Sequence, residues 1–191
     1  MPIERLRQTL SFLYSPRLTY EVLQDSDLDY IASFQEDPAL LDGSKTLVYR
    51  YDEMKEKFDH WGKTFQEDAF GVYRLNLRRQ DSAQGYEFVG TAGLSRASEK
   101  LPFGGEPEVC FLRIGRQFEN KGYGREATHR ILDVAFSQLE VVKVWAVTSH
   151  EYAKRMFEKE GFIWDGEFNY KHLTGQYGYL TKSDWDASLD Q

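Results

Sequence analysis

Two glycines one residue apart, within Lys121-Gly122-Tyr123-Gly124-Arg125, stand where a strand-like run gives way to a helical pattern. Glycines at such a turn let the backbone approach a ligand closely. The first amides of the following helix have no partner inside the helix, and the helix dipole favours an anion in front of them. This stretch therefore predicts a phosphate or pyrophosphate site.

The local charge agrees with an anion site. The whole chain has a net charge of -7. Residues 113–130 nevertheless carry two acids, Glu119 and Glu126, against five basic residues: Arg113, Arg116, Lys121, Arg125 and Arg130. So small a basic region in an acidic protein predicts a local anion site rather than a nucleic-acid surface. From spacing alone, a solvated helix face after two turn-permitting glycines is the plainer alternative.

The same spacing, Gly122-x-Gly124-x-x-Ala127, also fits the dinucleotide-binding fingerprint. That fingerprint opens a doubly wound sheet, with several further strand–helix units and an acid about 20 residues on, at the end of the second strand. Here one further unit is predicted, and Glu140 stands before the next strand rather than at its end. A dinucleotide site is therefore the weaker hypothesis.

Hydrophobic periodicity predicts the elements that position this turn. After Gly124, apolar residues recur every four positions at Ala127, Ile131, Ala135 and Leu139, which predicts a helix with one apolar face. Other helices are predicted from Asp25 or Ser26, along 54–65, and over 152–160 with Gly161 as C-terminal cap. Strands are predicted at 18–23, 70–77, 86–94, 109–114, 141–147, 162–170 and 177–181. The order β-α-α-β-β-β-α-β-α-β-β predicts a mixed α/β fold.

Composition bounds the class of protein. The 191 residues, 41% apolar and 15% aromatic, suit a single globular domain over 15–191, with residues 1–14 as an N-terminal extension that contains a helical turn. No apolar run approaches a membrane span, and the first residues lack a secretory signal. Cys110 is the single cysteine and the four histidines are scattered, so we expect no disulfide and no metal site. We expect a cytoplasmic protein that binds neither membranes nor nucleic acid.

Three patches of the sequence carry a family resemblance. Asn120-Lys121-Gly122-Tyr123-Gly124-Arg125-Glu126-Ala127 is the most specific of them. The others are Ser15-Pro16-Arg17-Leu18-Thr19 with Asp25-Ser26-Asp27-Leu28, and Arg155-Met156-Phe157-Glu158-Lys159-Glu160-Gly161-Phe162. Over roughly residues 15–185 the chain resembles the GNAT superfamily of acetyl-CoA-dependent N-acetyltransferases. Within it, the chain looks most like the branch that acetylates the N-termini of ribosomal proteins.

The resemblance implies how the coenzyme is held. Loop amides would bind the pyrophosphate of acetyl-CoA. The fourth and fifth strands, 109–115 and 141–149, would splay so that the pantetheine arm enters between them. The residues expected to bind the coenzyme are Leu112, Ile114, Arg116, Asn120, Lys121, Gly122, Tyr123, Gly124 and Arg125.

Acetyl transfer to an amine needs the amine in its neutral form, so a base is useful. Glu108, at the start of the fourth strand, resembles the family's base, and His150, at the end of the fifth, titrates in the right range. A water molecule acting for either of them is a further possibility. A backbone amide near 112–114 is expected to stabilise the developing oxyanion. Cys110, in an apolar strand, is expected to be a core residue.

The sequence departs from the family pattern at several positions. Glu119 stands where Gln, Arg or an aromatic residue is usual, and His150 and Ala153 stand where Asn and Ser are frequent. Phe157 replaces the tyrosine that some members use as general acid. The start of the fourth strand at Glu108 fits the family only if one extra residue before Gly122 is absorbed, for which a β-bulge is expected.

The expected function is acetyl transfer from acetyl-CoA to a primary amine, on a peptide N-terminus or a small molecule, by a monomer or homodimer. Deprotonating an α-amine at neutral pH is easier than deprotonating lysine by about two pKa units, roughly 3 kcal/mol, which favours an α-amine. The acidic remainder of the chain predicts attraction of a cationic acceptor. The alternatives are a coenzyme A-binding module with little or no catalysis and a structural or interaction protein.

Overall fold

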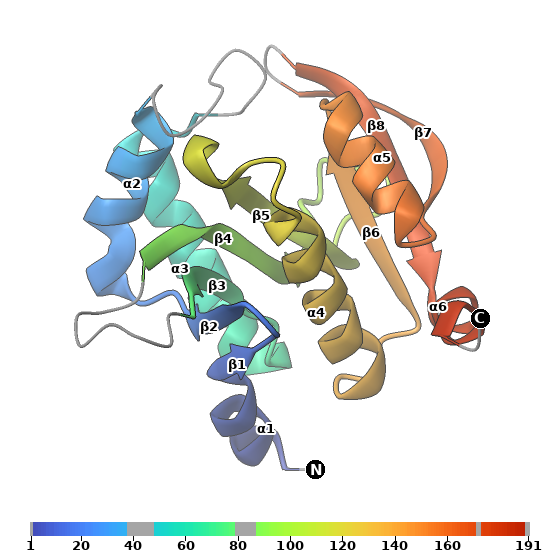
Figure 1. The fold of residues 1–191 in the computed structure, drawn as a ribbon, viewed down its shortest axis with the longest axis horizontal. Helices are drawn as coiled ribbons and strands as arrows, with labels where there is room; N and C mark the ends of the chain where they lie inside the picture. The colour runs from blue at the N-terminus through green and yellow to red at the C-terminus, as the bar shows by residue number, and fades with distance from the viewer. Residues whose placement is uncertain (1, 38–47, 79–86, 171–172, 190–191) are drawn as a thin grey trace.

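One mixed sheet of eight strands organises the chain, in the order β1-β2-β3-β4-β5-β6-β8-β7 (Figure 1). The computed structural model describes residues 2–37, 48–78, 87–170 and 173–189. The strands are β1 (Phe12–Tyr14), β2 (Leu18–Val22), β3 (Val72–Leu77), β4 (Glu87–Arg96), β5 (Pro107–Ile114), β6 (Lys143–Thr148), β7 (Ile163–Tyr170) and β8 (Leu173–Thr181). Neighbours are antiparallel except β5 and β6, which are parallel. The predicted mixed α/β fold is confirmed.

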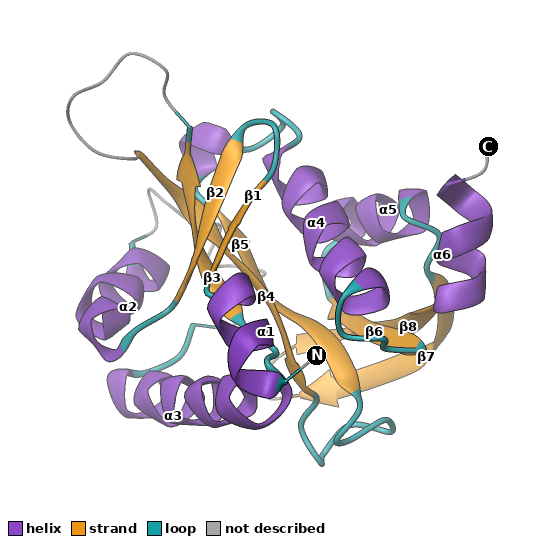
Figure 2. Cartoon of the chain, turned by 90° about the horizontal axis from the view of Figure 1, so that it is seen from below, coloured by secondary structure: helices purple, strands orange, loops and turns teal. Residues whose placement is uncertain are grey.

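Helices cover both faces of the sheet (Figure 2). They are α1 (Ile3–Leu10), α2 (Leu28–Glu36), α3 (Tyr51–Asp68), α4 (Tyr123–Ser137), α5 (Glu151–Lys159) and α6 (Lys182–Leu189). Helices α2 and α3 lie on one face, where Ile31, Met54 and Phe58 form a core with Val72 of β3. Helices α4, α5 and α6 lie on the other face, over the main core.

The N-terminal residues add to the sheet. Residues 1–14 were expected to form an extension with a helical turn, but 3–14 form α1 and the edge strand β1. Phe12 pairs with Glu21, and Leu10 and Leu13 are buried in the main core. A strand of three residues is too short to show the alternation that predicts a strand. Helix α6, whose Trp185 is buried, was not predicted either.

Three sequence expectations need correction in detail. Helix α2 does not begin with Asp25 or Ser26 as its cap, because a 3-10 turn occupies 25–27 and the carboxylate of Asp27 accepts from the backbone N–H of Gln24 at 3.0 Å. Helix α4 ends at Ser137, before Leu139. Strand β6 begins at Lys143 rather than 141, since Glu140 has φ +54° and Val142 is exposed.

Gly161 ends α5 as predicted. Its φ is +94°, a conformation that suits glycine, and its N–H donates to the carbonyl of Glu158 at 3.0 Å. The N–H of Phe162 donates to the carbonyl of Phe157 at 3.1 Å, which completes a Schellman motif. The motif places Glu160 at the helix end, facing α4.

Strands β5 and β6 separate after a short parallel contact. They pair only at Glu108 with Trp145 and at Val109 with Ala146. Beyond these pairs the two strands diverge, and α4 crosses the sheet beside the opening (Figure 1). The predicted splay of the fourth and fifth expected strands, which are β5 and β6, is therefore present.

Candidate active site

A β-bulge interrupts β5 next to the opening. The pairing of β4 with β5 shifts from Gly93 opposite Cys110 to Thr91 opposite Arg113, so residues 111 and 112 face the single residue 92. Phe111 has φ +50°, which is strained for an aromatic residue, and its carbonyl accepts from Oγ1 of Thr91 at 2.8 Å. The expected bulge is confirmed. A bulge leaves an extra residue outside the ladder, so its amide is free to face a ligand.

The bulge sorts the side chains of β5 between the two faces. Val109, Leu112 and Ile114 pack against the main core on the α4 side. Cys110 and Phe111 pack instead against the cluster of α2 and α3. For Leu112 and Ile114, two expected coenzyme residues, only the backbone is therefore left to face the opening.

Glu108 lies at the point where β5 and β6 part, and it is buried. Burial raises the pKa of its carboxyl to about 7, although the positive charge of Lys57 on α3 opposes the shift. Within the described residues, no hydrogen bond to this carboxyl occurs. A carboxyl that titrates near neutral pH at the edge of a gap suits a general base.

His150 lies elsewhere in the opening. It is the N-terminal cap of α5 and follows the end of β6 at Thr148, whereas Glu108 pairs with Trp145 near the start of that strand. Its backbone N–H donates to Oγ1 of Thr148 at 3.0 Å. It lines a cavity of about 160 Å³ together with Thr148, Ser149, Glu151, Lys154, Gly175 and Gln176. The structure thus does not bring the two candidate bases together.

The glycine turn has the backbone of an anion cradle. After a 3-10 turn over 116–118, Asn120 has φ +57° and Gly122 has φ +81°, and α4 begins at Tyr123. Arg116, Asn120 and Lys121 are exposed. The side chain of Glu119 is exposed too. Its backbone N–H donates to the carbonyl of Arg116 at 3.2 Å, so Glu119 contributes to the turn through its backbone amide.

Arg17, which the sequence did not mark as functional, holds this loop. Its Nε donates to Oε2 of Glu126 at 2.6 Å, and a terminal nitrogen donates to the carbonyl of Lys121 at 2.8 Å. Its guanidinium lies 4.5 Å from the ring centre of Tyr123. Burial alone would raise the pKa of Glu126, but hydrogen bonds from Ser15 and Arg17 lower it overall. The turn between β1 and β2 is thereby fastened to the glycine loop.

Arg125 is held by a different segment, the end of α5 at Glu160. Its Nε donates to Oε1 of Glu160 at 2.6 Å, and Oε2 of Glu160 contacts Nδ1 of His129 at 2.9 Å. Although burial favours its protonated form, the hydrogen bonds from His129 and Arg125 lower the pKa of Glu160. The side chain of Arg125 remains 57% exposed, so its terminal nitrogens face solvent beside the loop.

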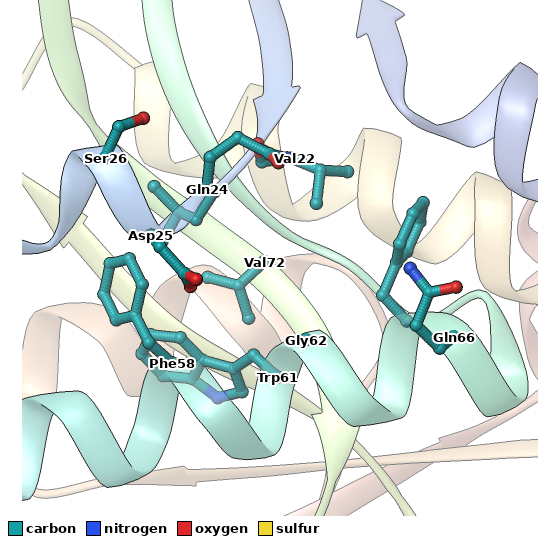
Figure 3. A pocket seen from close by; sticks show the side chains of 11 residues that line it. Val22, Gln24, Asp25, Ser26, Phe58, Trp61, Gly62, Gln66 and Val72 are labelled. Carbon is teal, nitrogen blue, oxygen red and sulfur yellow. The ribbon is translucent and has the colours of Figure 1, made fainter.

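A cavity of about 350 Å³ lies between α3 and the segment after β2 (Figure 3). Asp25 points toward it above the ring of Trp61, and Phe58 and Val72 form part of its wall. Its lining includes no residue of β5 or β6. It therefore does not include Glu108, although Trp61, which lines it, also contacts Phe111 of β5.

Comparison with known families agrees with this geometry. The family model described as "Acetyltransferase (GNAT) domain" matches residues 17–163. The chain belongs to the GNAT acetyltransferase family. Its match spans the turn at Arg17, the bulged strand, the glycine loop and both strands of the opening.

Solved GNAT structures share the fold at low sequence identity. A putative GNAT-family acetyltransferase from Bordetella pertussis is 17% identical, with a TM-score of 0.73, and the match covers 89% of this chain and 99% of that one. An aminoglycoside acetyltransferase in complex with coenzyme A and kanamycin is 16% identical (TM-score 0.67; 90% and 99% covered). The ribosomal-protein-S5-alanine acetyltransferase from Vibrio fischeri is 14% identical (TM-score 0.66; 91% and 98% covered).

Two further features bear on the chemistry of this GNAT domain. Phe157, where some family members have a tyrosine, has no hydroxyl and so offers no proton; its ring is buried, with its centre 5.0 Å from that of Phe162.

Within the residues that the structure describes, no group of His, Cys, Asp and Glu could hold a metal ion. No described helix is long and apolar enough to cross a membrane.

Proposed function

We propose that the protein transfers an acetyl group from acetyl-CoA to a primary α-amine, with Glu108 as general base. The observation that carries the proposal is the position of Glu108, buried at the parting of β5 and β6 with a pKa raised to about 7. A base with that pKa is about half ionised at neutral pH and still accepts a proton readily. His150, beyond the end of β6 at the start of α5, is the weaker candidate.

The residues of the opening fit the coenzyme. The left-handed Gly122 and the first turn of α4 present amides for a pyrophosphate, with Arg116, Lys121 and Arg125 adding positive charge. The backbone of β5 from 112 to 114 has no partner on β6 and suits the amide groups of a pantetheine arm. When bound, acetyl-CoA supplies the acetyl group as a reactive thioester.

The protein's own groups then manage protons and charge. As the N–C bond to the amine forms and the C–S bond breaks, Glu108 takes the proton that the amine loses. We assign the stabilisation of negative charge on the carbonyl oxygen to the backbone amide at the bulge, 111–112. Because Phe157 has no proton to give, the departing thiolate is protonated from solvent.

The acceptor is proposed to be an α-amine. At pH 7 an α-amine of pKa about 8 is roughly a tenth neutral, whereas lysine is well below one part in a thousand. Among the related structures, the Vibrio fischeri enzyme is named for an alanine of a ribosomal protein, and the aminoglycoside acetyltransferase holds kanamycin. Both names refer to amine acceptors, but their low identity carries only the fold to this chain.

Mass spectrometry after incubation with acetyl-CoA tests the proposal, using a peptide with a free N-terminus and one lysine together with a panel of amino acids and polyamines. Acetylation of α-amines, lost in Glu108→Gln, is the expected result. Acetylation confined to lysine would overturn the acceptor assignment. Coenzyme A binding without any transfer would favour the alternative of a non-catalytic coenzyme-binding module.

A further inference from the structure

We propose that the acceptor amine carries a carboxylate beside it, as an α-amino acid does, and that Lys57 of α3 recognises this carboxylate with support from Arg113. The inference rests on the proposed function and specifies its substrate class. It follows from where positive charge and aromatic rings meet on the α3 side of β5.

Five side chains form what we call the aromatic–cation wall: Tyr49, Lys57, Trp61, Phe111 and Arg113. Nζ of Lys57 lies 4.4 Å from the ring centre of Tyr49 and 6.0 Å from that of Trp61. The ring of Trp61 lies 4.7 Å from that of Phe111, over which the guanidinium of Arg113 lies at 5.2 Å. Two cations are therefore held by aromatic faces on the side of β5 toward which Cys110 and Phe111 point.

The aromatic–cation wall lies close enough to Glu108 for the charge of Lys57 to act on this proposed base. The charge of Lys57 acts on the carboxyl of Glu108 and on the thiol of Cys110, and the charge of Arg113 acts on the same thiol. Along β5, Glu108 comes first, Cys110 follows it on the same face, and Arg113 comes after the bulge at 111–112. The arrangement matches a zwitterion whose ammonium group faces Glu108 and whose carboxylate faces Lys57.

A purely cationic acceptor fits this surface poorly, contrary to the attraction expected from the overall charge. The positive charge of Lys57 would repel the second ammonium group of a polyamine or of a basic side chain at close range. The acidic residues that give the chain its net charge of -7 act through water, where charges more than about 10 Å apart are largely screened. The local charges therefore decide the acceptor.

Binding of products to the coenzyme A-loaded protein tests the inference without requiring turnover. N-Acetylphenylalanine and N-acetylphenethylamine differ only in the carboxylate, and calorimetry compares them. A charged hydrogen bond predicts at least tenfold tighter binding of N-acetylphenylalanine, with the preference lost in Lys57→Gln and retained in Lys55→Gln on the same helix. Equal binding, tighter binding of N-acetylphenethylamine, or no binding of either would overturn the inference.

Steady-state kinetics supply the second arm, comparing phenylalanine with phenethylamine as acceptors. The expected result is a kcat/KM at least tenfold higher for phenylalanine, reduced to near equality in Lys57→Gln. The midpoint of the acidic limb should also move to higher pH in that variant, because the charge that opposes the raised pKa of Glu108 is removed. If products bind with the carboxylate preference but no amine is acetylated, the proposed function fails and the recognition of the carboxylate stands.

Discussion

The carboxylate of Glu126 on α4 accepts two hydrogen bonds from Arg17, one from its backbone N–H at 2.8 Å and one from its Nε at 2.6 Å. The two residues are 109 positions apart, and their contact closes the turn between β1 and β2 over the glycine loop. A second bond from the same guanidinium, to the carbonyl of Lys121 at 2.8 Å, ties the glycine loop itself to Arg17. Arg17 therefore positions the glycine loop, to which we assign coenzyme binding.

Replacing Arg17 should weaken coenzyme binding more than catalysis. In Arg17→Ala the largely buried carboxylate of Glu126 loses its bond from Nε and keeps the one from the backbone N–H of residue 17, and the loop is no longer held at Lys121. Leaving a buried acceptor unsatisfied costs about 1–3 kcal/mol, so we expect coenzyme A affinity to fall about tenfold. Calorimetry measures the affinity, with Arg5→Ala on exposed α1 as control. A changed kcat at saturating acetyl-CoA with unchanged affinity would argue against positioning.

The two glycines of the loop should respond differently to alanine. Gly122 has φ +81°, where a side chain costs about 1–2 kcal/mol, so Gly122→Ala should distort the cradle and lower coenzyme A affinity about tenfold. Gly124 lies inside α4, and a Cβ added there would be 3.6 Å from Ile114 and 3.7 Å from Met156. These are ordinary contacts in a helical conformation, so Gly124→Ala should lose less coenzyme A affinity than Gly122→Ala. Equal losses in both variants would contradict the conformational explanation.

The features that could be predicted from sequence are local ones. The glycine turn before α4 and the C-terminal cap Gly161 follow from residue type and spacing over a few positions, and the bulge in β5 was expected from the fit to the family pattern. The order of strands and helices followed from periodicity for the same reason.

The features that escaped prediction depend on packing between distant segments. The bonds of Arg17 to Glu126 and the approach of Lys57 to β5 arise only when α4 and α3 settle on opposite faces of the sheet. The raised pKa of Glu108 likewise requires burial, which no pattern around that residue reveals. Strand β1 was missed because three residues carry too little periodicity.

The pH dependence of turnover should distinguish the two candidate bases. With a pKa raised to about 7, Glu108 predicts an acidic limb in kcat/KM with a midpoint near pH 7, the rate rising with pH as the carboxyl ionises. Glu108→Gln should lower turnover by about 10²-fold or more and leave coenzyme affinity unchanged. His150→Gln should keep the limb. If the limb instead survives Glu108→Gln and disappears in His150→Gln, the base is His150.

The same carboxyl should make the protein less stable as pH rises. Its pKa is about 7 in the folded protein against the ordinary 4.5, so between those values the folded state binds more protons than the unfolded state. The free energy of unfolding therefore decreases as pH rises from about 4.5 to 7, and it stays constant at higher pH.

Glu108→Gln should not lose this stability. At pH 8 the variant should be more stable than the wild type by roughly 3 kcal/mol, and the difference should disappear near pH 4. Urea denaturation at both pH values measures the difference. The exposed Glu106→Gln is the control, and a gain in Glu108→Gln that does not change with pH would show that burial of the charge is not its cause.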